Sequence, residues 1–297
     1  MGTRREFLQR LSALSVAVAI PAPVRWTGRR AWAIDPFTLG VASGDPSDDG
    51  VVLWTRLAPD PLHGGGLPNA DVDLRWEVAE DEGMRRVVRS GTAVATSAFA
   101  HAVHVEVDRL RAGRWYWYRF RAGDAESPIG RTRTMPSAEA ATDRLRLVVA
   151  SCQHYEQGYY PAFRHMAREE IDLVAHLGDY IYESTVPGRV RQHGSPAPRT
   201  LAAYRARYAL YKRDPDLQTA HAAAPWIVTW DDHEVENNYA SDVASRADVS
   251  REEFLLQRAA AYRAYYEHQP LRRSAMPRGP GAQRIGCQDA PASGRGY

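Results

Sequence analysis

The feature that most constrains the fold is a pair of apolar runs that each end in an acidic motif. The run that starts at Leu173 leads into Gly-Asp-Tyr-Ile-Tyr-Glu at residues 178–183, and the run that starts at Trp226 leads into Asp-Asp-His-Glu at residues 231–234. Such apolar runs are typical of parallel strands that are buried on both faces. Open α/β sheets bind ligands at the carboxyl edge of their strands. We therefore expect both motifs to lie at one edge of one sheet.

The residues of the two motifs are suited to binding hard metal ions. Asp179 provides a carboxylate, and Tyr182, three residues later, can turn its phenol oxygen back toward the same ion. Asp232 and His233 add an oxygen ligand and an imidazole from a neighbouring strand end. A water molecule activated between two such ions hydrolyses phosphate esters. The layout favours a metal-assisted phosphate hydrolase, although Asp179 alone also fits a helix cap and Tyr182 alone also fits simple packing.

Apolar strands and helices alternate after residue 144. The pattern predicts strands over residues 145–150, 171–177 and 226–230, and helices over residues 160–170, 201–211, 215–222 and 252–267. This alternation predicts a buried parallel sheet. Cys152 follows the first strand, where a ligand or a nucleophile would lie, and His154 stays open as a further ligand. His176 lies inside an apolar strand and is better interpreted as a core histidine.

The region before residue 137 has the pattern of an all-β domain. Short β-rich runs recur at residues 51–55, 72–78, 103–107 and 115–120 between turn-rich stretches, which predicts a small β-sandwich over residues 37–136. Tyr116, Tyr118 and Phe120 alternate with Trp117 and Arg119, so we expect one face of that strand to enter a core. Residues 136–143 have the composition of a linker. A catalytic domain is then expected over residues 144–280.

The amino terminus has the features of an export signal. Arg4 and Arg5 precede Phe7 and Leu8, and the apolar run over residues 11–20 is shorter than the roughly 20 residues that span a bilayer. We expect residues 1–33 to be a twin-arginine signal peptide, processed after Ala-Trp-Ala at residues 31–33. The twin-arginine translocase would be the partner during export to the periplasm, the cell wall or the medium, with no stable membrane anchor. An ordinary amphipathic helix is the alternative.

Charge and cysteine content narrow the function classes further. The formal net charge is +2, so electrostatics alone predicts no specific nucleic-acid partner. The chain has two cysteines, Cys152 and Cys287. A disulfide between them is the ordinary expectation for an exported protein, and it competes with a ligand role for Cys152.

Three motifs in fixed order carry a family resemblance. Ser-Cys-Gln at residues 151–153, the 178–183 motif and Trp-Asp-Asp-His-Glu-Val-Glu-Asn-Asn at residues 230–238 are similar to the PhoD-like alkaline phosphatases, a branch of the metallophosphoesterases. The resemblance runs from Phe37 to Gly281. It implies an exported hydrolase of phosphate monoesters and diesters, built on an α/β metallophosphoesterase sheet. It also implies iron(III) bound by Cys152, Asp179 and Tyr182 beside calcium ions.

The same resemblance suggests roles for the remaining motif residues. Asp179 would bridge to a second ion, and Asp232 would be an oxygen ligand of that ion. His233 is the candidate catalytic residue, because an imidazole can contact a phosphoryl oxygen or protonate the leaving group. Asn237 and Asn238 would bind substrate oxygens or simply end the turn. A purple-acid-type phosphatase also combines a β-sandwich with a Gly-Asp-x-x-Tyr motif. Cys152 and Asp232 argue against it, because that class has Asp and Asn there.

The end of the chain differs from the family pattern. Family members continue well past this length and provide further aspartate and histidine ligands, whereas residues 281–297 have neither strand nor helix periodicity. This tail resembles the product of a frameshift or of a fragmentary gene. We therefore expect a partial catalytic domain that lacks the second half of its sheet and is a poor catalyst. A non-catalytic fragment that retains the β-sandwich is the alternative.

Overall fold

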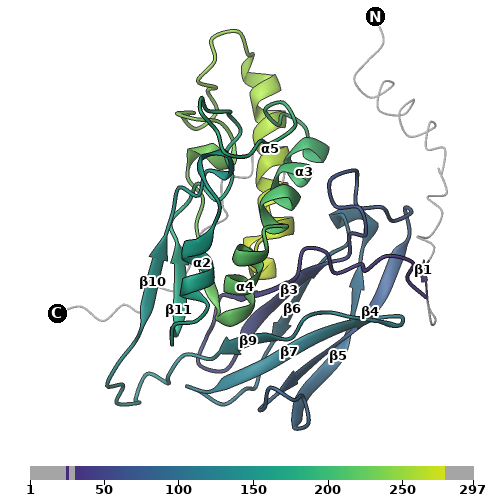
Figure 1. Cartoon of the computed structure of the whole chain (residues 1–297), viewed down its shortest axis with the longest axis vertical. Helices are drawn as coiled ribbons and strands as arrows, with labels where there is room; N and C mark the ends of the chain where they lie inside the picture. The colour runs from purple at the N-terminus through teal and green to yellow at the C-terminus, as the bar shows by residue number, and fades with distance from the viewer. Residues whose placement is uncertain (1–24, 27–30, 278–297) are drawn as a thin grey trace, which may run out of the picture.

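The computed structural model describes residues 25–26 and 31–277, and its strands form two sheets (Figure 1). Residues 1–24, 27–30 and 278–297 lie outside the described part. The predicted twin-arginine motif, the predicted tail over residues 281–297 and Cys287 therefore lie outside it. Within the described part, residues 136–143 contain neither helix nor strand.

The first sheet joins both halves of the chain. Its strand order is β10 (Leu147–Ala150), β11 (Leu173–His176), β12 (Trp226–Val228), β2 (Val41–Gly44), β3 (Val51–Arg56) and β6 (Ala102–Val107). The strands from β10 to β2 run parallel, which agrees with the parallel sheet expected after residue 144, and β2, β3 and β6 are antiparallel. Gly44 pairs with Trp226, so strands from the predicted sandwich extend the predicted catalytic sheet.

The second sheet is formed by the amino-terminal half alone. It contains β1 (Arg25–Trp26), β4 (Asp71–Ala79), β5 (Val87–Ala95), β7 (Trp115–Ala122), β8 (Ala125–Glu126) and β9 (Gly130–Arg133). All its pairings are antiparallel except that of β1 with β4. The side chains of Tyr116, Tyr118 and Phe120 are buried as expected. Sequence patterning did not predict β5, because its residues do not alternate cleanly between buried and exposed.

Among the described residues, the two larger of three hydrophobic cores hold these layers together. One core lies between the two sheets and contains Val51 and Leu53 of β3 together with Val72 and Leu74 of β4. The other core packs helices against the parallel strands and contains Val174 of β11. Since β3 belongs to the first sheet and also lines the core shared with the second, the two predicted domains have a common layer.

Over the described residues the α-helices are α2 (Pro161–Met166), α3 (Leu201–Lys212), α4 (Pro215–Ala223) and α5 (Arg251–His268). Their starts follow local capping chemistry, because the Asp214 side chain accepts the backbone N–H of Asp216 and Leu217, and Ser250 forms a capping box with Glu253. The helix expected over residues 160–170 ends at Met166, and the strand expected over residues 226–230 ends at Val228. None of the described helices is both long and apolar enough to cross a bilayer.

Candidate active site

The ends of β10, β11 and β12 lie side by side. In the parallel register Ala150 is paired with His176, and His176 with Val228. The loops beyond the strands are bonded as well: the backbone N–H of Cys152 donates to the carbonyl of Gly178 at 3.2 Å, and that of Gln153 donates to the carbonyl of Asp179 at 3.2 Å. The strand order therefore brings two of the motifs into direct contact, as the sequence predicted.

Gly178 allows the third motif to approach. Its φ is +105°, a conformation that L side chains rarely adopt. A Cβ at this position would lie 2.6 Å from both the Cβ and the backbone nitrogen of Asp231. Only glycine therefore permits the loop after β11 to pass so close to the loop after β12.

Two candidate ligands sit on left-handed backbone. Cys152 has a φ of 56° and Asp179 a φ of 55°. For residues other than glycine, asparagine or aspartate this region is rarely populated, and each such residue costs on the order of 1 to 3 kcal/mol unless its surroundings hold it. Such conformations cluster at functional sites. The Cys152 thiol is free and exposed at this strand end.

The buried carboxylate of Glu234 fixes this backbone. Glu234 belongs to η3 (Asp232–Glu234), a single 3₁₀ turn after β12. Its carboxylate accepts the backbone N–H of Asp179 at 3.0 Å, that of Asp231 at 2.7 Å, and that of Tyr180. Burial raises the pKa of Glu234 to about 8, although these three donors oppose the shift. One side chain thus ties the loop after β11 to the loop after β12.

Tyr182 turns back toward Asp179, as its spacing predicted. Its hydroxyl donates to Asp179 Oδ2 at 2.8 Å. Its ring lies between the rings of His154 and His233, with centroids 4.3 Å and 4.1 Å away. Burial, the bond to Asp179 and the adjacent Cys152 thiol all raise the pKa of Tyr182. Cys152, Asp179 and Tyr182 are therefore neighbours in space.

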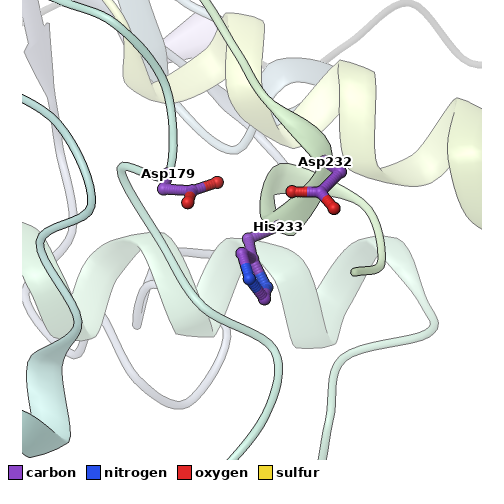
Figure 2. Close-up of side chains that lie close together, drawn as sticks. All are labelled: Asp179, Asp232 and His233. Carbon is purple, nitrogen blue, oxygen red and sulfur yellow. The ribbon is translucent and has the colours of Figure 1, made fainter. Parts of the chain in front are cut away.

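The second group of candidate ligands gathers around the same aspartate. Ligand atoms of Asp179, Asp232 and His233 lie within 4.8 Å of one another. Figure 2 shows their side chains converging, with Asp179 on the loop after β11 and the other two on η3. Asp179 Oδ1 is buried and has no hydrogen-bond partner among the described residues. A buried carboxylate oxygen without a partner is unfavourable, and a cation would satisfy it.

His233 is oriented by a second acidic residue. Its Nδ1 lies 2.7 Å from Glu183 Oε2, and Glu183 Oε1 accepts the backbone N–H of Asn237 at 3.2 Å. Burial alone would lower the pKa of His233, but the Glu183 bond and the charges of Glu183, Asp179 and Asp232 outweigh burial and raise it. Since Glu183 occupies Nδ1, Nε2 is the ring nitrogen left for a ligand or a substrate.

The remaining predicted residues lie around this centre. Asn237 and Asn238 are exposed, and the Asn238 backbone N–H donates to Asp232 Oδ2. His154 is buried, and its Nδ1 accepts the backbone N–H of Glu156 while its ring packs on Tyr182. His176 is only 1% exposed and stacks on Trp226, which confirms the core interpretation.

Sequence reasoning missed Glu183 and Glu234 as site residues. Both lie inside the motifs that the sequence singled out, and each is the last residue of one of them. An acidic residue in the loop that follows a buried parallel strand is a usable signal. The pattern does not say whether such a side chain points at a metal, at a histidine or at backbone N–H groups. Only the fold shows that Glu183 contacts His233 and that Glu234 contacts backbone.

Comparisons with known proteins agree with this geometry. Residues 147–285 match the PhoD-like phosphatase family, and residues 22–136 match the PhoD-like phosphatase N-terminal domain. Alkaline phosphatase D of Bacillus subtilis (strain 168) is 51% identical over 292 residues, which cover 94% of this chain and 50% of that protein. A solved structure of PhoD superposes with a TM-score of 0.83 at 54% identity, covering 86% of this chain and 50% of that one. The chain thus spans about half the length of these relatives.

Proposed function

Since the chain belongs to the PhoD-like phosphatase family, a family of phosphoric ester hydrolases, we propose that it hydrolyses phosphate monoesters and diesters with the aid of bound metal ions. The observation that carries this proposal is the convergence of Cys152, Asp179, Tyr182, Asp232 and His233 at the ends of three adjacent parallel strands.

The donor set fits two different ions. Cys152, Asp179 and Tyr182 would hold iron(III), because thiolate, carboxylate and phenolate are all anionic and suit a highly charged ion. The proton between Tyr182 and Asp179 Oδ2 would leave when the ion binds. Asp232, together with Asp179, would hold calcium, which prefers oxygen ligands. When bound, such ions supply Lewis acidity toward water and toward the phosphoryl oxygens.

The protein's own groups would orient the substrate and move the proton. Glu183 holds the ring of His233 by Nδ1, so that Nε2 can contact a phosphoryl oxygen or give a proton to the leaving alkoxide. Asn237 and Asn238 would bind substrate oxygens from the exposed loop beyond η3. Glu234 would act only through backbone, by keeping Asp179 and Asp231 in place.

We also propose that turnover by this chain alone is low. The described residues bring together four proposed metal ligands for two ions, whereas calcium alone takes six to eight oxygen ligands. A partly filled coordination shell binds an ion weakly and positions the reacting groups loosely. Misplacement by about 1 Å can cost on the order of a hundredfold in rate. Hydrolysis of p-nitrophenyl phosphate and of bis-p-nitrophenyl phosphate measures this directly.

The metal assignment is tested by colour. Iron(III) held by Tyr182 and Cys152 gives a visible ligand-to-metal charge-transfer band, so Tyr182→Phe should shift or erase that band and Cys152→Ser should lower the iron content. Tyr180→Phe is the matched control, because the Tyr180 hydroxyl contacts His221 in the core and not the site. Tyr180→Phe should keep the band. A colourless wild-type protein with bound iron would contradict the ligand set.

Export by the twin-arginine route is a further part of the proposal. It is supported by Arg4 and Arg5 before Phe7 and Leu8, which lie outside the described residues. Replacing both arginines with lysine should leave the precursor in the cytoplasm, as fractionation and blotting would detect. Unchanged export of that variant would defeat the proposal.

A further inference from the structure

A cavity lies away from the metal-binding motifs, between the loop after β3 and helix α3. Its volume is about 320 Å³. Its polar and charged lining residues include Arg56, Asn69, Ser97, His101 and Arg205, and Leu62 and Leu67 add apolar wall. None of the candidate ligands of the active site lines it.

Arg56, the last residue of β3, is only 1% exposed and is bonded only to neutral groups. Its Nε donates to the carbonyl of Ala100 at 2.9 Å, and its Nη1 lies 2.8 Å from His268 Nε2. His268 Nδ1 lies 2.7 Å from the carbonyl of Ala264 and must donate to it, so Nε2 accepts from Arg56 and the ring is neutral. Burial is the main reason that the pKa of His268 is lowered, which agrees with a neutral ring.

The third nitrogen of Arg56 lies against the glycine loop beside the cavity. Nη2 lies 3.4 Å from the position that a Cβ on Gly65 would take. Gly64, Gly65 and Gly66 all have positive φ values, and a Cβ on Gly64 would meet nothing within 4 Å. The loop next to Nη2 therefore presents backbone without side chains, and its Gly64 lines the cavity.

The charges around the cavity do not balance. Within residues 25–26 and 31–277, no carboxylate forms an ion pair with Arg56. Glu267 is the carboxylate that acts on it most strongly, and it is already shared by Arg205 at 2.5 Å and Arg263 at 3.0 Å. Arg56 therefore has no carboxylate of its own, because Glu267 is paired with Arg205 and Arg263, and the nearby buried Asp71 accepts hydrogen bonds from Ser97. A buried charge without a counter-charge costs several kcal/mol.

We propose that this cavity binds a small oxyanion, held by Nη2 of Arg56 and by the positive field of Arg205. A tetrahedral phosphate or sulfate or a planar carboxylate fits the guanidinium chemistry, since arginine forms charge-assisted bonds to each. The anion supplies the missing counter-charge. A free inorganic anion and the acidic group of an organic molecule would bind arginine in the same way. The apolar side chains of Leu62 and Leu67 would favour the organic acid.

The test uses the purified chain after treatment with a chelator, so that anion binding at the metal centre does not contribute. Sulfate and benzoate are titrated separately by calorimetry, with sodium chloride at matched ionic strength as the blank. We expect one binding event per chain that chloride does not reproduce. Tighter binding of sulfate would identify the ligand of the cavity as a free inorganic anion, and tighter binding of benzoate would identify it as an organic acid. If neither anion binds, the proposal is overturned.

Two substitutions in α3 test whether the anion binds in this cavity. Ala202 lines the cavity and is exposed in the first turn of α3, so Ala202→Glu places a carboxylate at the cavity without disturbing the core. This variant should weaken anion binding at least tenfold. Ala203→Glu adds the same charge to the same turn, but position 203 does not line the cavity, so binding should persist. Equal loss in both variants, or no loss in either, would place the anion elsewhere and refute the site.

Discussion

The two ends of the first sheet are built differently. Every residue of β2 and β3 is buried, because helices cover one face of these strands and the second sheet covers the other. At the opposite edge, no residue of β10 is fully buried: Val148 and Ala150 are partly buried against the helical core, whereas Leu147 and Val149 are 49% and 57% exposed. We call β2, β3 and β6 the closed half of the sheet, and β10, β11 and β12 the open half.

The difference shows how stability and chemistry are divided in this molecule. The closed half is the more completely buried, whereas the open half carries the candidate ligands on the loops that follow its strands, with Cys152 and Asp179 on left-handed backbone. Left-handed residues and a buried carboxylate oxygen without a partner cost stability where the site is built. A fully packed neighbouring half can hold such a site in place. Substitutions in the open half should therefore reduce metal binding, whereas substitutions in the closed half should reduce stability.

The largest effect is expected from Asp179→Asn in the open half. Asparagine keeps the size of the side chain and tolerates a positive φ, but it removes the charge shared by both proposed ion sites. Retained iron and calcium should fall at least about a hundredfold, because even losing a residue behind a ligand costs up to about that much. The measurement is elemental analysis after dialysis, with the melting temperature recorded alongside.

Asp231→Asn is the control for that variant. Asp231 caps η3 in the same motif, and asparagine caps a helix as well as aspartate does. Metal content should remain as in the unchanged chain. Equal metal loss in both variants would show that the whole motif, and not the Asp179 carboxylate, determines binding.

In the closed half, Trp54→Ala should cost stability and not metal. Trp54 is fully buried in β3, its indole N–H donates to the carbonyl of Glu267 at 3.0 Å, and the Lys212 ammonium lies 4.3 Å from its ring. Truncating a buried aromatic side chain costs about 3 to 5 kcal/mol. Urea unfolding followed by circular dichroism would measure it. A loss below 1 kcal/mol would show that the closed half is not the stabilising half.

Lys212 of α3, which packs on Trp54 of the closed half, makes stability depend on pH. Burial lowers the pKa of Lys212 to about 7, whereas the unfolded chain keeps a lysine pKa near 10.4. Between these values the unfolded state binds one more proton, so stability rises with pH by up to about 1.4 kcal/mol per unit from pH 7 to 10. Lys212→Met should flatten that slope and stabilise the protein at pH 7. If the increase of stability with pH persists in Lys212→Met, other titrating groups cause it.

The smallest effect is expected at the exposed face of β10. Val149→Thr should change the unfolding free energy by no more than about 0.5 kcal/mol, because the side chain is exposed. Val148→Thr, one residue earlier, places a hydroxyl against the helical core and should cost clearly more. An edge strand with apolar exposed residues also promotes association, so Val149→Thr should lower self-association in sedimentation. Equal losses of stability in Val148→Thr and Val149→Thr would contradict the difference between the two faces of β10.

The contact between Tyr182 and Asp179 was predictable from sequence because it is local. The spacing of Asp179 and Tyr182 determines that the phenol can return to the carboxylate, and the structure has that bond at 2.8 Å. Asp214 before Pro215 similarly predicted the start of α4. By contrast, Glu183 and Glu234 have nearly the same local setting, and they differ only in what the fold places opposite them.

The sequence by itself determined which segments are apolar strands, where the helices begin, and which side chains can bind hard cations, since each depends on residues within a few positions of one another. The tertiary structure alone decided that β2 and β3 continue the sheet of the motifs, and that Gly178 lets Asp231 approach. It also decided that Arg56 meets His268 with no carboxylate opposite among the described residues. These contacts join positions far apart in the chain, and their energies depend on packing and burial that no local pattern encodes.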